Sequence, residues 1–495
     1  MKWILLCSIS FSSSLRIPMG KRVLSSSSGG CGSRGKMAIE MAARDGEFRV
    51  FVVAGEVSGD SIAARLMNSL RRLSPFPVRF SGVGGTLMRK EGLKSLFPME
   101  DIAVMGIWEL LPHLRKLRMK LNETVEASVL FQPHVVLTVD SKGFSFRLHR
   151  KLREKFRSHQ EDCPLQIHYV APSFWAWKGG ERRLKNLSSF LDHLLCILPF
   201  EEQVFRRCGI AATFVGHPML EDDLELKSEA KPRCYEQEGN SEGFLSSHGL
   251  PSGTTVITLL PGSRLQEVTR MLPIFLNTLE LLKRSFPQLA IVVITAPNDH
   301  VKAYVDKVVG RWSLPIILVP GASLREKYAA FSASTAALCT SGTAVMELQL
   351  ARLPCVVAYR AHILTELLIK HKTKLKFISL SNILLESAII PEVLFQACTP
   401  ENLAIALRRV ICDPSVREQQ IINAEKVFKM ISPPERITAD FVPSDLGSGF
   451  VPHCASMNAA AVILYSVRKP LPNTGNRSIN ALPEFIGTTK NSQML

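Results

Sequence analysis

A short loop in the second half of the chain carries residues that could bind a diphosphate. The apolar stretch Thr255–Leu260 is followed by Pro-Gly-Ser-Arg, in which Gly262, Ser263 and Arg264 lie just before a predicted helix. At such a position free backbone amides, the positive end of a helix dipole and a guanidinium group can converge on one anion. The pattern favours a diphosphate cradle, and the alternative is an ordinary turn with Arg264 in solvent.

A second loop combines hydroxyl groups with a carboxylate. Residues Ser341, Gly342 and Thr343 follow the apolar run Ala336–Cys339, and Glu347 lies one turn inside the helix predicted next. Hydroxyl and amide groups at a helix start can bind phosphate, while a carboxylate one turn further can accept both hydroxyls of a ribose. The alternative is a capped helix with a solvated glutamate.

The first half of the chain offers a candidate general base and a loop for a sugar. Asp140 follows the apolar stretch Val135–Val139. A carboxylate at this position could accept a proton from a substrate if its neighbours raise its pKa. The alternative role for Asp140 is to cap the next helix. The loop 55–60 and the glycine cluster 82–85 lack the G-x-G-x-x-G spacing of a dinucleotide site. Both loops could instead admit a sugar acceptor close to the backbone.

These loops belong to an alternation of strands and helices. From Phe48 onward, short β-branched runs are each followed by a Gly/Ser loop and a segment of helical period, as in Phe48–Ala54 and Ser61–Leu73. This alternation predicts an α/β fold of two Rossmann-like halves with parallel sheets. The predicted divisions are 46–220 for the first domain, 221–253 for a linker or insertion, 254–430 for the second domain, and 431–495 for a tail with one helix near 457–467.

Residues 1–39 have the composition of an organellar transit peptide. They contain six basic residues, no acidic residue and two runs of serine. We expect import into the mitochondrion, with the plastid as the alternative organelle. A disordered tail and a secretory signal are the other interpretations.

The overall composition narrows the classes of partner. The chain of 495 residues has a formal net charge of +16 and is 46% hydrophobic, which fits a folded protein that binds anions. Its eleven cysteines form no C-x-x-C pair and no zinc-ligand cluster, so neither a disulfide framework nor a metal site is predicted. The positive charge is dispersed without interleaved aromatic residues, which argues against nucleic-acid binding.

One stretch could bind an anionic membrane surface. Between 110 and 121, leucines recur on one helical face and four basic residues surround them. This pattern is typical of a helix on anionic lipid, and equally of a helix that packs on its own sheet with a solvated basic face. No apolar run reaches the roughly 18 residues of a membrane-spanning helix, so we expect peripheral contact at most.

Taken together, the loops resemble those of the lipid-A-disaccharide synthase family, in an organelle-targeted, plant-like form. The resemblance extends from Val50 to Arg408, and its specificity lies in the order and spacing of motifs that are individually common. The motifs are AGEVSGD at 54–60, MEDIAVMG at 99–106, IHYVAPSFWAW at 167–177, LPFE at 198–201, GHP at 216–218, PGSR at 261–264, SGT at 341–343 with Glu347, VVAY at 356–359 and SLSN at 379–382.

The resemblance implies a GT-B architecture and an inverting glycosyltransferase that needs neither a metal nor a cofactor. Its substrates would be acylated glucosamines: UDP-2,3-diacylglucosamine donates its sugar to 2,3-diacylglucosamine 1-phosphate, giving a β-1,6 disaccharide and UDP. Homo-oligomerisation is left open. By this resemblance Asp140 is the base, the acceptor is bound by Glu56, Ser58, Gly59, Met105 and Trp175, and the donor is bound by the two phosphate loops with Glu347, Tyr359, Asn382, Glu392 and Gln396.

Two departures from the family pattern keep other interpretations open. The family's Asp-x-Pro-Asp-Phe is Asp-Ser-Lys-Gly-Phe at 140–144, so one acid is missing and Lys142 is new. The segment Pro391–Gln396 is one residue longer, which would rotate Gln396 by about 100° on a helix. The competing interpretations are a UDP-N-acetylglucosamine 2-epimerase-like enzyme, which needs no lipid, and a catalytically silent lipid-binding protein.

Overall fold

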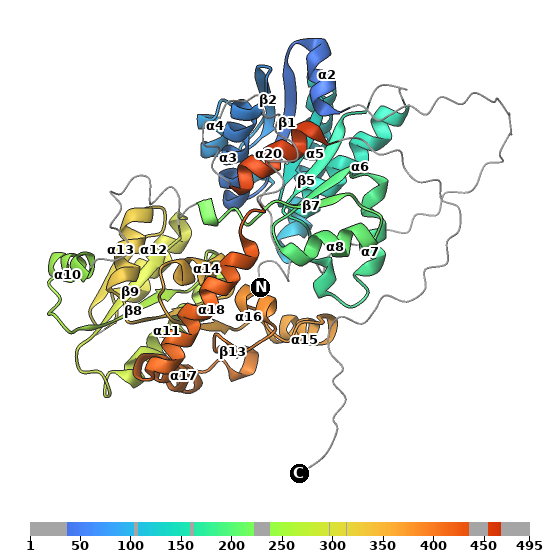
Figure 1. Ribbon diagram of the computed structural model, residues 1–495. Coiled ribbons are helices and arrows are strands. Elements are labelled where there is room, and N and C mark those ends of the chain that lie inside the picture. The colour runs from blue at the N-terminus through green and yellow to red at the C-terminus, as the bar shows by residue number, and fades with distance from the viewer. Residues whose placement is uncertain are drawn as a thin grey trace, which may run out of the picture.

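The computed structural model describes residues 37–102, 107–158, 163–221, 238–296, 298–312, 314–434 and 454–466. Two α/β domains lie next to each other, as expected, with the N-terminal one in blue to green (Figure 1). Met105 and residues 1–36 of the predicted transit peptide lie outside the described residues. Within the described ranges, no helix combines the length and the hydropathy needed to cross a membrane.

The first domain is built on a seven-stranded sheet in the order β3-β2-β1-β4-β5-β6-β7. All neighbouring strands run parallel. Central strands such as β4, in which all five residues are buried, are continuous apolar runs because helices cover both faces of the sheet. The bounds are β1 Phe48–Ala54, β2 Val78–Val83, β3 Lys94–Ser95, β4 Val135–Val139, β5 Leu165–Tyr169, β6 His193–Cys196 and β7 Ala212–Phe214.

Two separate cores cover the faces of this sheet. Val50 and Val52 of β1 pack with α3 and the C-terminal helix α20, whereas Phe51 and Val53 pack with α5 and α6. The alternation follows from the period of two in a strand. The helices are α2 Ala38–Asp45, α3 Val57–Leu73, α4 Thr86–Lys90, α5 Ile107–Phe131, α6 Lys142–Ser158, α7 Glu181–Lys185 and α8 Pro199–Arg207, with 3-10 turns η1 Met99–Asp101, η2 Phe174–Ala176 and η3 Leu187–Ser189.

The first described helix overlaps the segment predicted as a transit peptide. Helix α2 starts at Ala38, and the side chains of Ala38 and Ala42 are buried in the first core. Burial of small residues against the sheet therefore places residues 38–45 in the first domain.

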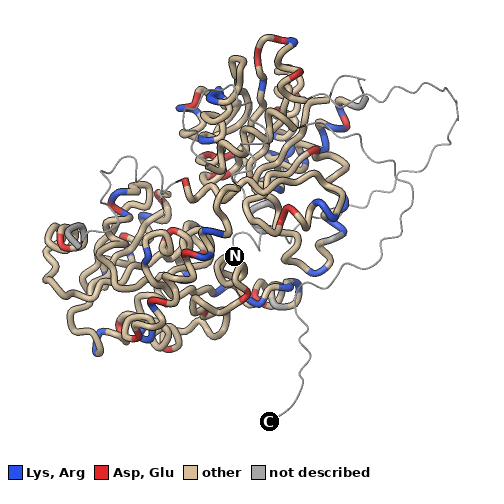
Figure 2. Tube along the Cα trace, viewed as in Figure 1, with Lys and Arg blue, Asp and Glu red and all other residues tan. Residues whose placement is uncertain are grey.

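Helix α5 contains the stretch predicted to bind a membrane. Its Leu117 and Leu121 pack against the core on one face of the first sheet, so this part of the apolar face covers the domain's own strands. Lys116 forms an ion pair with Asp101 at 2.6 Å. The side chains of residues 107–114 are not among those described. Lysines and arginines are spread over both domains and interleaved with acidic residues, in keeping with the dispersed charge (Figure 2).

The second domain contains a six-stranded parallel sheet in the order β10-β9-β8-β11-β12-β13. Helices α11, α12 and α17 pack on one face, and α13 and α14 on the other. The strands are β8 Thr255–Leu260, β9 Leu289–Thr295, β10 Ile316–Pro320, β11 Ala336–Cys339, β12 Cys355–Tyr359 and β13 Glu392–Leu394. The helices are α10 Glu238–Ser247, α11 Leu265–Leu282, α12 Asp299–Val309, α13 Leu324–Ala333, α14 Thr343–Leu350, α15 Ile363–Lys372, α16 Leu380–Leu385, α17 Pro400–Cys412 and α18 Pro414–Ile431, with the turn η4 Phe395–Ala397.

Helix α10 lies in the segment predicted as a linker or insertion. Its Phe244 and Leu245 are buried in the same core as Tyr328 and Phe331 of α13. Residues 238–247 are thus packed on the second domain.

The chain returns to the first domain after α18. The His217 amide donates to the Ile431 carbonyl at 2.9 Å. The final helix α20 (Ala455–Tyr465), predicted at 457–467, then packs against α3, as the red helix beside the blue one shows (Figure 1). The Ser456 amide and hydroxyl both donate to Glu221, at 2.7 and 2.8 Å. The tail helix is therefore a structural part of the first domain.

A second connection joins the domains near η2. Trp177 and Thr373 form an isolated antiparallel bridge. The Lys178 amide donates to the Lys372 carbonyl at 2.8 Å, and the Lys374 amide donates to the Ala176 carbonyl at 2.9 Å. The motif at 167–177 is thus attached to the segment that follows α15.

Candidate active site

Each sheet reverses its strand order at one point, and the candidate loops lie at those points. In the first sheet the reversal falls between β1 and β4, and in the second between β8 and β11. Helices leave the two central strands toward opposite faces there, so the loops diverge and leave room for a ligand. Residues 55–56 and 140–141 form the loops after β1 and β4, and residues 261–264 and 340–342 form those after β8 and β11. The loop predicted at 55–60 is thus shorter in the structure, because α3 begins at Val57 and its first turn contains Ser58, Gly59 and Asp60.

The loop after β8 combines a tight glycine turn with the N-terminus of a long helix, and the Glu267 carboxylate lies directly against Gly262. Gly262 has φ +121°, which a side chain would disfavour, and Arg264 is the N-cap of α11. The Thr340 amide donates to the Leu260 carbonyl at 3.0 Å, which holds the loop after β11 beside it. Gly262, Ser263 and Arg264 therefore lie at the N-terminus of an 18-residue helix, close to the second predicted loop.

The loop after β11 contributes unequally to the site. Gly342 caps α14 with φ +134°, and no atom lies within 4 Å of the position a Cβ would take. Thr343 is exposed beside it. The hydroxyl of buried Ser341 donates to the Ile378 carbonyl at 3.0 Å and thereby anchors the loop. The open space lies over Gly342 and Thr343.

A buried lysine that the sequence did not single out holds Glu347. Lys327 of α13 is only 6% exposed, and its Nζ lies 3.0 Å from Glu347 Oε2. This ion pair fixes the carboxylate that we predicted to bind a ribose. No sequence signal marks Lys327, because its partner lies on another helix across the β11 crossover.

Asn382 and Glu392 are brought together, but their hydrogen bonds are made to protein groups. Glu392 accepts from the amides of Ile378 and Ser379, both at 2.9 Å, and from Asn382 Nδ2 at 2.9 Å. Asn382 Oδ1 accepts from the Ile389 and Ile390 amides, at 3.0 and 2.9 Å. These two predicted donor residues fasten the start of α16 to β13, so a role in the donor site would be indirect.

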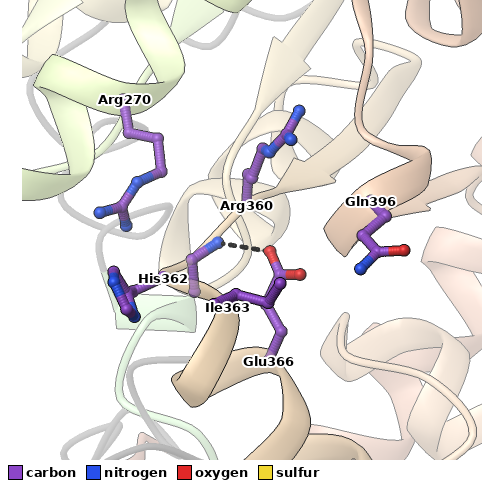
Figure 3. A pocket seen from close by; sticks show the side chains of 7 residues that line it. Arg270, Arg360, His362, Ile363, Glu366 and Gln396 are labelled. Atoms are coloured by element: carbon purple, nitrogen blue, oxygen red, sulfur yellow. Dashed lines mark hydrogen bonds between the residues drawn. The ribbon is translucent and has the colours of Figure 1, made fainter.

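Gln396 lies apart from them, on an open pocket of about 470 Å³. Its lining comes from α11, the loop after β12 and η4, and Glu366 of α15 accepts from the Ala361 amide at 3.0 Å (Figure 3). The lining residues are Arg270, Arg360, Ala361, His362, Ile363, Glu366 and Gln396.

Tyr359 ends β12, directly before Arg360 of the pocket. Burial raises the pKa of its phenol, the Glu267 carboxylate raises it further, and Arg270 and Arg264 oppose the shift. The phenol is therefore protonated at neutral pH.

In the first domain, the Asp140 loop has an unusual backbone. Asp140 and Ser141 have φ +53° and +44°, and the Asp140 amide donates to the Tyr169 carbonyl at 3.0 Å. A Cβ on Gly55 would lie 2.6 Å from Ser141 Cβ, so only glycine fits there. Non-glycine residues with positive φ cost about 1–3 kcal/mol and cluster at functional sites. The tight contact places the loop after β1 directly against the candidate base.

Three of the other predicted acceptor residues follow β1 at this contact. Glu56 is buried at the start of α3, Ser58 is exposed, and a Cβ on Gly59 would lie 3.3 Å from the Val139 carbonyl. Asp60 has a structural role, because its carboxylate accepts from the Gly85 amide at 2.8 Å and from two further amides at the start of α4. Glu56, Ser58 and Gly59 thus lie beside the Asp140 loop.

Two buried histidines lie beneath the same strand. Thr138 lies on β4, two residues before Asp140. Its Oγ1 is 2.7 Å from both His149 Nε2 and His168 Nδ1. Burial lowers the pKa of both imidazoles, so they are neutral at physiological pH. This polar chain supports the β4 end without adding charge.

Trp175 is held by a buried glutamate. Its indole Nε1 donates to Glu201 Oε1 at 3.1 Å, and its ring packs edge-to-face on Phe200 at 4.7 Å. Glu201 is 0% exposed, and burial raises its pKa to about 8. The sequence marked Glu201 only as part of a motif, since its burial depends on the tertiary packing.

We expect Lys327→Met to weaken donor binding. Without the ammonium group the Glu347 carboxylate loses its orientation, so KM for the UDP-sugar should rise about tenfold with a smaller change in kcat. Initial rates against donor concentration measure this. The matched control is Lys302→Met, an exposed lysine on α12. An unchanged KM in a folded Lys327→Met protein would contradict the positioning role.

Glu201 should make stability fall as the pH rises. Between about pH 4.5 and 8 the unfolded chain carries an ionised Glu201 while the folded protein keeps it protonated, so folding binds a proton. Relative to Glu201→Gln, the wild-type free energy of unfolding should therefore decrease across this window by a few kcal/mol, on the order given by the linkage relation. Denaturant titrations of both proteins at several pH values measure the difference. A constant difference would refute the raised pKa.

In the described part of the chain, no three His, Cys, Asp or Glu side chains converge as a metal-binding cluster.

Solved structures with a similar fold include S. aureus MnaA with UDP (TM-score 0.52, 12% identity, 77% of this chain and 95% of that one). A UDP-GlcNAc 2-epimerase from Neisseria meningitidis bound to UDP-GlcNAc is also similar, with a TM-score of 0.51 and 14% identity over 77% of this chain and 98% of that one. The kitacinnamycin glycotransferase has a TM-score of 0.50 and 14% identity over 84% of this chain and 98% of its own. At these identities the likeness shows the two-domain GT-B fold alone.

Sequence comparison is more specific. The family model for lipid-A-disaccharide synthetase matches residues 50–440. A protein of Arabidopsis thaliana named "Probable lipid-A-disaccharide synthase, mitochondrial" is 59% identical over 402 residues, covering 81% of this chain and 87% of its own. The lipid-A-disaccharide synthase of Rhodospirillum centenum is 42% identical over 397 residues, which cover 79% of this chain and 93% of that protein. The chain belongs to the lipid-A-disaccharide synthase family of glycosyltransferases.

Proposed function

We propose that the protein transfers 2,3-diacylglucosamine from UDP to the 6-hydroxyl of 2,3-diacylglucosamine 1-phosphate, with inversion at the anomeric carbon. The products are the β-1,6-linked disaccharide 1-phosphate and UDP. Family membership supports the reaction. The observation that carries the division of roles is that a carboxylate, Asp140, and an anion cradle ending in Arg264 lie at the switch points of the two sheets.

Asp140 acts as the general base in this proposal. Its carboxylate takes the proton of the acceptor hydroxyl while the hydroxyl oxygen bonds to the anomeric carbon. The bond between that carbon and the β-phosphate oxygen breaks, and its electron pair leaves with UDP. The strained loop, set against Gly55, holds the carboxylate at the edge where the acceptor loop lies.

The cradle stabilises the leaving group. Negative charge grows on the diphosphate as the bond breaks, and fixed amides of Gly262 and Ser263 with the Arg264 guanidinium stabilise it without reorganisation. Gly342 and Thr343 complete the cradle, and Glu347, oriented by Lys327, binds the ribose. These groups would do the work that a divalent cation does in other glycosyltransferases.

Asp140→Asn should lower kcat by about 10²- to 10⁴-fold, because an amide cannot accept the proton. UDP binding should stay within about twofold of the wild-type value, since the cradle lies in the other domain. Product formation from both diacylated sugars, identified by mass spectrometry, measures the effect. Asp306→Asn, an exposed residue on α12, is the matched control. Near-normal turnover of Asp140→Asn would remove Asp140 from this role.

Arg264→Met should raise the Kd of UDP by about ten- to a hundredfold, the loss expected for charge-assisted hydrogen bonds. The matched control is Arg311→Met, at an exposed residue just after α12, which should leave the Kd of UDP unchanged. Wild-type activity should survive a chelator. Activity that disappears with the chelator and returns with magnesium would contradict the metal-independent mechanism.

The same assay distinguishes the other two interpretations. Because the fold is similar to that of a UDP-GlcNAc 2-epimerase, the assay should also be run without an acylated acceptor. An epimerase-like enzyme would then epimerise the donor or release UDP. The altered loop at 140–144 favours testing a silent lipid-binding protein, which would bind both sugars without turnover.

We also propose a mitochondrial location and peripheral contact with anionic membranes. The basic, acid-free N-terminal segment and the printed name of the Arabidopsis relative support the location. The exposed basic residues Arg115 and Arg118 of α5 support the contact, whereas its packed leucines do not contribute.

A further inference from the structure

The pocket of about 470 Å³ beside Gln396 has no assigned ligand, and its position is informative. It opens beyond the carboxyl ends of β12 and β13, and its lining includes residues of α11 and α15. Glu347 and its Lys327 partner belong to α14 and α13, on the face of the second sheet opposite α11. The predicted ribose position and the pocket therefore share no lining residue, and the pocket can hold another part of a substrate.

The charged groups of the pocket suit a phosphate-bearing ligand. Arg270 and Arg360 contribute two permanent positive charges against one carboxylate, that of Glu366. Glu366 is buried and accepts from the Ala361 amide at 3.0 Å, which fixes the loop that carries Arg360. Arg360 Nη1 donates to the Cys398 carbonyl at 3.3 Å, so its guanidinium is held in place. A cavity of this size falls within the range of small-molecule sites.

An apolar surface leads out of the pocket. Ile363 lines it and is 55% exposed, and Leu367, one turn further along α15, is 48% exposed. Single exposed apolar residues are common and need no explanation. Here two of them share one helical face that begins at a polar pocket, and α15 ends at the bridge to the first domain.

Resting on the proposed function, we propose that this pocket binds the phosphorylated sugar of an acylated glucosamine, with its acyl chains along Ile363 and Leu367. The guanidinium groups of Arg270 and Arg360 contact the phosphate, and Gln396 contacts a sugar hydroxyl. The phosphates of the UDP-linked donor are those that the cradle holds in the proposed function, so the ligand of this pocket is the acceptor, 2,3-diacylglucosamine 1-phosphate.

Equilibrium binding without turnover tests the proposal. The ligands are 2,3-diacylglucosamine 1-phosphate and UDP-2,3-diacylglucosamine with short acyl chains, their deacylated forms, and UDP. Arg270→Met should raise the Kd of the glucosamine 1-phosphate about tenfold, acylated or not, and leave the Kd values of UDP and of the UDP-linked donor within about twofold. Weaker binding of UDP and the UDP-linked donor instead would place the donor's diphosphate in this pocket and contradict the proposal. Ile363→Ser combined with Leu367→Ser should weaken only the acylated form, also about tenfold.

The matched controls are Arg284→Met, just after α11, and Ile405→Ser, 70% exposed on α17. The proposal is overturned if Arg270→Met leaves binding of the 1-phosphate unchanged, or weakens UDP equally, or if the serine variant affects deacylated ligands as strongly. A wild-type protein that makes disaccharide while its variants bind normally refutes this inference alone. Arginine-dependent binding without any disaccharide product refutes the proposed function alone.

Discussion

The site depends on the pairing of strands that are distant in the chain, β1 with β4 and β8 with β11. Each pairing creates the point where strand order reverses, and the following helices then leave toward opposite faces of the sheet. In the second sheet α11 and α14 are buried in two different cores, so the loops that precede them must diverge. The hydrogen bond from the Thr340 amide to the Leu260 carbonyl keeps their bases together. Without this pairing, Arg264 and Gly342 would belong to separate loops with no common ligand.

Backbone constraints then shape the loops that the pairing brings together. At Gly55 the contact with Ser141 leaves no room for a side chain, and at Gly262 the backbone angle itself favours glycine. Asp140 keeps a positive φ at a cost of about 1–3 kcal/mol, which the fully buried strand β4 must offset. Candidate catalytic groups are thus held by rigid strands and tight contacts rather than by mobile segments. This arrangement fits a reaction that relies on preorganised charge.

Local patterns predicted the strands and their end loops, because a buried strand followed by a Gly-rich turn is encoded within about ten residues. The ends of β1, β4 and β8 were placed correctly from such patterns. Lys327, Glu201 and Arg270 carry no such signal, since their importance arises from partners on other elements. The sequence also did not reveal that Asn382 and Glu392 bind protein groups. Both side chains accept hydrogen bonds from backbone amides that come within reach only in the folded loop. Sequence patterns therefore predicted the loops of the candidate site, and the tertiary contacts show which of their side chains are already bound to protein groups.

The acceptor side of the first domain is physically tied to the donor side of the second. Trp175 packs against two cores, one within the first domain and one that contains residues of both domains, and two residues later Trp177 bridges to Thr373. Helix α15 connects the pocket at Glu366 to that bridge. The two backbone hydrogen bonds of the bridge contribute about 0.5–1.5 kcal/mol each. The buried Glu201 carboxylate accepts from the Trp175 indole, so Trp175 is held within the first domain while the bridge two residues later connects it to the second.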